Sequence, residues 1–272
     1  MTKLGKAAWR RPFVLIICIK RQTLLILLPL VSIGAYNFVA IFAAYSLDLS
    51  QKTVAIDPGH GGIDGGTHDR QGLLEKDLNL EVALLLKSWL EEKKIRVVMT
   101  RNSDISLEGY SDLQSSRYRR DLDARRDIVN RSAADALISV HVNARPNVPA
   151  SRGVIVFYYL ESEEGKKLAA SVTQAIERLV FKRFLKADAA RPESAPENFF
   201  ILREVTVPGC LVELGFITNP EDKKLLQNEE YKKQMAAAMG KGVIDYFKKA
   251  GASPLTRAKE ALARWQKALS SF

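Results

Sequence analysis

Two of the chain's three histidines stand where predicted β-strands end. His60 follows the apolar run TVAID (53–57), and His141 lies near the end of ALISVHV (136–142). Ligand-binding groups in open α/β sheets gather at the carboxyl ends of the strands, so the two imidazoles can meet in one crevice. The glycines around His60, in GHGGIDGG, allow a tight turn that brings backbone close to such a site. The spacing therefore favours one site that contains both histidines.

Two glutamates can complete this site. Glu75 comes fifteen residues after His60, which is enough chain to fold back over the same crevice. Two imidazoles and one carboxylate are a ligand set suited to catalytic zinc, which keeps one position for water or substrate. Glu213 lies in the strand candidate CLVEL (210–214), and a carboxylate there, outside the ligand set, could move a proton from water to a leaving nitrogen. Residue types alone leave an alternative open, in which the histidines are structural and Glu75 is a helix N-terminal charge.

Other polar residues near these motifs are weaker candidates for the site. Asp57 and Asn143 each flank a histidine and could orient the ligands from outside the metal, although turn and strand-end hydrogen bonds explain them equally well. His68 lies in a polar loop with no strand beside it, so we expect it to be exposed. The arginines of 117–126 could face an anionic substrate, but pairing with the aspartates of the same segment is the simpler interpretation.

The elements that position these residues alternate between strand and helix. This alternation predicts an α/β fold with a mostly parallel twisted sheet and helices on both faces. The residues from Leu78 to Trp89 place their apolar side chains on one helical face. We expect RPESAPENFFILREVTVPG (191–209) to be a loop at the edge of the groove, with Phe199 and Phe200 packing beneath it. The remaining strand candidates are 95–99 and 153–159, and the remaining helices lie near 121–134, 165–181 and 221–249.

The first 50 residues predict a membrane-directed segment. Basic residues precede a run of 25 uncharged residues over 23–47. As a helix this run would reach roughly 37 Å, enough to cross a hydrocarbon core of about 30 Å. The basic flank predicts a cytoplasmic N-terminus and an exported remainder. A cleaved signal peptide is the alternative, but the apolar run is long for one and lacks a good cleavage site.

These features divide the chain into three parts. We expect a membrane anchor or signal segment over 1–50, a catalytic domain over 51–250 and an amphipathic C-terminal helix over 251–272. The full chain of 272 residues has a formal charge of +10, which favours anionic partners such as lipid or an acidic wall polymer. No nucleic-acid-binding motif accompanies this charge, so we expect no nucleic-acid partner.

Four motifs, taken together and in order, resemble the zinc-dependent N-acetylmuramoyl-L-alanine amidases. They are VAIDPGHGGIDGG (54–66), LLEKDLNLEVA (73–83), ISVHVNA (138–144) and LVELGFITNPED (211–222). The resemblance implies one Zn²⁺ per chain, held by His60, Glu75 and His141. It also implies that Glu213 is the catalytic glutamate. The segment 106–130, followed by GVIVFYY (153–159), is similar to the germination-specific, spore-cortex branch of this family, called CwlD.

Membership of that family would imply hydrolysis of the amide between N-acetylmuramic acid and the L-alanine of the peptidoglycan stem peptide. In the spore cortex, this step would prepare muramic acid for lactam formation. The expected location is outside the cytoplasm, anchored to the membrane, with the forespore intermembrane space as one setting. The need for a protein activator stays open. The rival interpretations are a zinc peptidase that cuts within the stem peptide and a non-catalytic wall-binding module.

Overall fold

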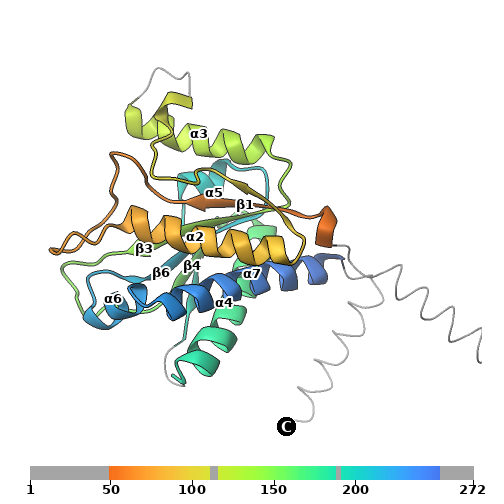
Figure 1. Ribbon diagram of the computed structural model, residues 1–272. Helices are drawn as coiled ribbons and strands as arrows, with labels where there is room; N and C mark the ends of the chain where they lie inside the picture. Colours follow the sequence, from red (N-terminus) through yellow and green to blue (C-terminus); the bar gives the residue numbers. More distant parts are fainter. Residues whose placement is uncertain (1–48, 111–115, 188–190, 252–272) are drawn as a thin grey trace, which may run out of the picture. The chain divides into compact units, whose positions relative to one another are not determined.

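Six strands form one sheet at the centre of the computed structural model, which describes residues 49–110, 116–187 and 191–251 (Figure 1). Their order across the sheet is β2-β1-β3-β6-β4-β5. All neighbouring pairs are parallel except β4 and β6, which are antiparallel. The strands are β1 (Thr53–Pro58), β2 (Arg96–Met99), β3 (Ala136–Asn143), β4 (Ile155–Tyr158), β5 (Glu193–Pro196) and β6 (Gly209–Phe216).

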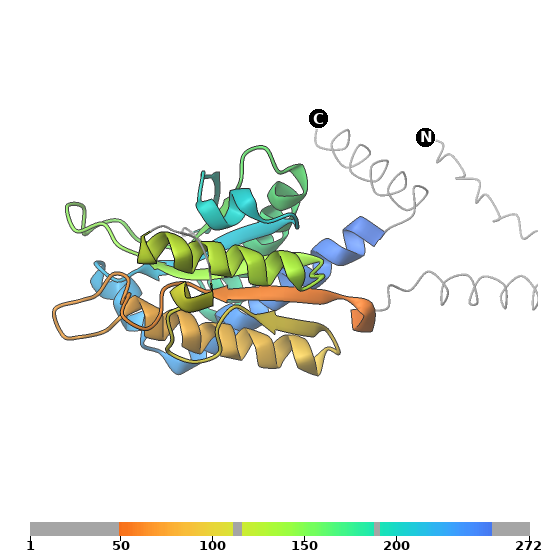
Figure 2. The same ribbon diagram turned by 90° about the horizontal axis from the view of Figure 1, so that it is seen from above.

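Helices cover both faces of this sheet (Figure 2). One face carries α2 (Glu75–Glu92), α4 (Glu163–Ile176) and α7 (Glu229–Gly251), and α7 contacts both of the others. The opposite face carries α3 (Arg117–Arg131) and α5 (Phe200–Glu204). The shorter elements are η1 (Leu49–Gln51), η2 (Glu108–Tyr110), η3 (Glu177–Phe184), which continues α4 with π-helical turns, and α6 (Pro220–Leu226).

The two faces are separated by the alternation of side chains along each central strand. In β1, Val54 and Ile56 enter the core beneath α2, α4 and α7, whereas Ala55 enters the smaller core beneath α3 and α5. Strands β3 and β6 alternate in the same way. All three are buried along nearly their whole length, as expected for the centre of a parallel sheet.

The α/β fold predicted from the sequence is confirmed, with two local differences. The predicted single helix over 221–249 is wrong, because Asn228 separates α6 from α7 and accepts a hydrogen bond from the Tyr231 amide as an N-terminal cap. The predicted loop over 191–209 instead contains the edge strand β5 and the short helix α5.

The predicted membrane segment (1–50) and the predicted C-terminal helix (251–272) lie almost entirely in 1–48 and 252–272, outside the described residues. Residues 49–110, 116–187 and 191–251 contain no apolar helix of membrane-spanning length.

Candidate active site

The carboxyl ends of β1 and β3 and the start of α2 bring three of the predicted residues together. His60 Nε2 lies 3.2 Å from Glu75 Oε1, and His141 Nδ1 lies 3.0 Å from the same oxygen. The two imidazole rings meet edge to face, with their centroids 5.1 Å apart. One ligand atom from each residue lies within 4.8 Å of the others. Three side chains separated by up to 81 residues thus converge on one point.

The spacing of these atoms fits a shared zinc ion. Two ligands about 2.1 Å from a tetrahedral zinc lie about 3.4 Å from each other, close to the two distances to Glu75 Oε1. The donor set of two imidazole nitrogens and one carboxylate oxygen is also that of catalytic zinc sites. The residues present therefore fit the metal that the family resemblance implies.

The electrostatics of His60 and Glu75 favour positive charge at this point. Burial alone would lower the pKa of His60, but hydrogen bonds to Glu75 and Asp64 outweigh it and raise the pKa to about 9. Burial would likewise raise the pKa of Glu75, but hydrogen bonds to His141 and His60 hold it well below its usual range. A carboxylate with this environment stays ionised and available to a cation.

Glu75 is held by backbone groups on two sides. Its Oε2 accepts from the Thr67 amide at 2.8 Å, and its Oε1 accepts from the Val142 amide at 3.2 Å. The loop before α2 folds back on the helix, since the Glu75 amide donates to the Thr67 carbonyl at 2.9 Å. Asn79, one turn along α2, adds a donor to Glu75 Oε1 at 3.3 Å. These contacts fix the carboxylate before any ligand arrives.

Gly59 lets the backbone of the first motif pass against the second imidazole. A Cβ at this position would lie 2.1 Å from His141 Cε1, a distance that no side chain can tolerate. The close approach is fixed by a hydrogen bond of 3.0 Å from the Gly59 amide to the Val140 carbonyl. The glycine is therefore required by the packing of His141.

Glu213 stands beside this cluster without joining it. The β3–β6 register pairs it with His141, and the two side chains point to the same face of the sheet. Its Oε2 is buried and has no hydrogen-bond partner among the described residues. Burial raises the pKa of Glu213 to about 7. A carboxyl group with that pKa can both accept and return a proton near neutral pH.

The other two sequence candidates, Asp57 and Asn143, make hydrogen bonds of the structural kind that the sequence had left open beside a role in orienting the ligands. The Asp57 carboxylate binds Thr100, Ser139 and Arg125 rather than an imidazole. Asn143 accepts from the Ala144 amide through its own side chain.

Sequence reasoning missed Asp64, whose carboxylate lies 2.8 Å from His60 Nδ1, on the nitrogen that faces away from Glu75. Its only signal in the sequence was its place four residues after His60. His68 is exposed, as expected.

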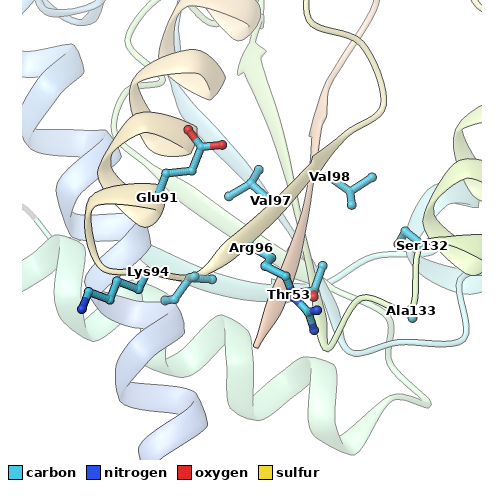
Figure 3. A pocket seen from close by; sticks show the side chains of 9 residues that line it. Thr53, Glu91, Lys94, Arg96, Val97, Val98, Ser132 and Ala133 are labelled. Carbon is cyan, nitrogen blue, oxygen red and sulfur yellow. The ribbon is translucent and has the colours of Figure 1, made fainter. Parts of the chain in front are cut away.

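A surface depression of about 640 Å³ lies elsewhere, at the amino ends of β1 and β2 (Figure 3). Thr53, Arg96 and Ser132 are among the residues that line it. None of the candidate ligands contributes to it, so it is not part of this site.

Comparison with known families decides which enzyme class this site belongs to. The family model for N-acetylmuramoyl-L-alanine amidases matches residues 54–245, which include all four site residues. The chain belongs to the N-acetylmuramoyl-L-alanine amidase family. It is therefore an amide hydrolase.

Among curated relatives of this amidase is the germination-specific N-acetylmuramoyl-L-alanine amidase of Bacillus subtilis. It is 36% identical over 215 residues, which cover 77% of this chain and 86% of the relative. The probable cell wall amidase LytH of Staphylococcus aureus is 31% identical over 203 residues, 73% of this chain and 60% of LytH.

Solved amidase structures share the fold. The CwlD amidase from Clostridioides difficile, solved in complex with the GerS lipoprotein, has a TM-score of 0.64 and 30% identity, with 72% of this chain and 98% of CwlD covered. A second N-acetylmuramoyl-L-alanine amidase, from Clostridium difficile 630, has a TM-score of 0.60 and 35% identity, with 72% and 96% covered.

Proposed function

We propose that this amidase uses one zinc ion to hydrolyse the amide between the lactyl group of N-acetylmuramic acid and the L-alanine of the stem peptide. The observation that carries the proposal is the convergence of His60, Glu75 and His141 beside a buried carboxyl group, Glu213. A site that lacked one of these four groups would miss either a metal ligand or the proton-transferring group of the proposed reaction. The chain retains all four.

In this proposal His60, Glu75 and His141 hold the metal. When bound, zinc supplies a Lewis acid that polarises the scissile carbonyl and makes water more acidic. Asp64 orients His60 from the far side of its ring, and backbone amides orient Glu75. The protein's contribution is thus a ligand set that is held in place before the metal binds.

Glu213 moves the proton. It accepts a proton from water as the water oxygen attacks the carbonyl carbon, and it returns this proton to the alanine nitrogen as the C–N bond breaks. The products are the lactyl carboxylic acid and the alanine amine, which become a carboxylate and an ammonium group near neutral pH. Its position opposite His141, outside the ligand set, keeps the carboxylate available for both transfers.

The names of two relatives support spore-cortex maturation as the setting of the proposed reaction. The B. subtilis relative is named a germination-specific amidase, and the neighbouring CwlD was solved with a lipoprotein. We propose the same role for this chain, with peptidoglycan as substrate, a protein partner and an extracytoplasmic location. Anchoring through the segment 23–47 is a proposal that rests on the sequence alone.

One experiment tests the reaction and the metal together. The purified full chain is assayed for bound metal and is then incubated with spore-type peptidoglycan, and the products are identified by mass spectrometry. We expect about one zinc per chain and release of intact stem peptides that begin with L-alanine, lost on chelation and restored by Zn²⁺. Peptides cut internally would indicate the rival peptidase. Absence of any product in the presence of zinc and partner would indicate a wall-binding module and would refute the proposal.

A further inference from the structure

Three consecutive carbonyl groups at the end of β1 are held by side chains rather than by the sheet alone. They belong to Pro58, Gly59 and His60, the residues that carry the first candidate ligand out of the strand. His60 itself has φ +62°, a left-handed conformation that costs a non-glycine residue about 1 kcal/mol or more. Something outside the loop must therefore hold this backbone in place.

Arg125 on α3 holds two of these carbonyls. Its guanidinium donates to the Pro58 carbonyl at 2.8 Å and to the His60 carbonyl at 2.6 Å. The same group is fixed from behind by Asp57 at 2.8 Å and by Asp121 at 2.6 Å. The Arg125 side chain is only 3% exposed. Asp57 thus acts on His60 indirectly, because it holds the guanidinium that binds the His60 carbonyl.

Arg101, just after β2, holds the loop from the other side. Its guanidinium donates to the carbonyls of Pro58 and Gly59, each at 2.9 Å. It also donates at 2.9 Å to the carbonyl of Lys76, which is next to Glu75 in the first turn of α2. One side chain therefore ties the loop of the first ligand to the helix of the second.

The charge on Arg101 is not neutralised by a direct partner. Among the described residues it makes no ion pair with a carboxylate, although it is 2% exposed. A buried cation is costly unless it is well hydrogen-bonded, and a second cation near a metal site opposes metal binding. Geometry explains why a guanidinium is used here: its planar fork of donors can hold several carbonyls in fixed directions, which a lysine ammonium cannot do.

We propose that Arg101 and Arg125 are positioning residues, which clamp the carbonyls of residues 58–60 and so fix the His60 imidazole for the metal. The inference rests on the proposed zinc role of His60. Neither arginine touches the metal or the substrate in this scheme; both act through the backbone of the ligand.

The test compares neighbouring arginines on the same helix. Arg125→Lys keeps the positive charge but removes the planar guanidinium with its several donors. The control is Arg126→Lys, at an arginine that pairs with Asp123 and Asp127 and makes no hydrogen bond to the His60 loop. The dissociation constant for Zn²⁺ is measured by competition with a chromophoric chelator. We expect about 10- to 100-fold weaker binding for Arg125→Lys and less than about 2-fold change for Arg126→Lys. The visible spectrum of the cobalt-substituted protein should change only in the first variant.

Each alternative outcome has a distinct meaning. If Arg125→Lys folds and binds zinc as tightly as the native chain, with unchanged kcat, the clamp is refuted and the arginine is only structural. If Arg125→Lys does not fold, Asp121→Asn tests the clamp instead, because it weakens the ion pair that holds the Arg125 guanidinium on its partly exposed side. About 3- to 10-fold weaker zinc binding in that variant supports the clamp, and an unchanged constant overturns it. A native chain that binds no zinc refutes the proposed function itself, and this inference with it.

Discussion

Replacing Glu213 by glutamine removes a charge from a position where the fold solvates it poorly. The residue is 9% exposed, and one of its carboxylate oxygens has no hydrogen-bond partner among the described residues. Burial raises its pKa from 4.5 to about 7. Glutamine has the same shape without the charge, so the variant separates the cost of the charge from the cost of changed packing.

The size and sign of the effect follow from this pKa. Between pH 4.5 and about 7 the unfolded chain has already lost the Glu213 proton, while the folded chain keeps it. The protonated Glu213 side chain therefore makes its full contribution to the free energy of unfolding below pH 4.5. This contribution, about 3 kcal/mol in total, is lost as the pH rises through 7. Glu213→Gln should be more stable than the native chain by about 2–3 kcal/mol at pH 8, and close to it at pH 4.5.

Urea unfolding in the presence of a chelator, at pH 8 and at pH 4.5, measures this difference. In parallel, zinc content should stay near one per chain, while turnover falls by about 100- to 10,000-fold. A variant that is less stable than the native chain at pH 8 would refute the argument that the buried charge is costly. Near-native turnover would refute the proton-transfer role.

Two further substitutions test the geometry around the histidines. Gly59→Ala should weaken zinc binding at least about 10-fold and lower the free energy of unfolding by about 1–3 kcal/mol, because its methyl group would collide with His141. The control is Gly109→Ala, at a position with open space around it. This control should change the free energy of unfolding by less than about 0.5 kcal/mol. Chelator competition and urea unfolding measure both, and equal behaviour of the two variants would contradict the packing argument. Asp64→Asn keeps the shape of the group behind His60 but not its charge, and should raise the zinc dissociation constant about 10-fold. A change below about 2-fold would show that Asp64 does not help His60 to bind zinc.

Much of the site could be predicted because its residues belong to strongly patterned elements. His60, His141 and Glu213 each lie at or near the end of an apolar run that became a central strand. Parallel strands end at one edge of the sheet, so the order of the motifs already implied their meeting. Glu75 was a candidate because the fifteen residues after His60 are enough chain to fold back over the crevice, and it is the first residue of α2. In these cases the pattern and the tertiary structure have the same physical origin.

The contacts that the sequence could not predict are those between side chains and distant backbone. Arg125 looked like one charge among many on a basic segment, and only the packing of α3 against the end of β1 shows its role. Asp64 depends on the left-handed conformation of His60, which no periodicity encodes. The cap at Asn228 was hidden because the polar residues on both sides fit a continuous helix. Such features are set by three-dimensional neighbours and not by local pattern.

The pairing register of β3 and β6 determines on which face of the sheet His141 and Glu213 lie. His141 and Glu213 face the α3 side only because Val140 and Val212 face the large core on the other side. A slip of one residue would turn either polar group into that core, away from its companion. These two core valines thus decide whether the proposed proton carrier, Glu213, and the proposed metal ligand, His141, lie on the same face. Substitutions there could silence the enzyme while the molecule still appears folded by its helix content.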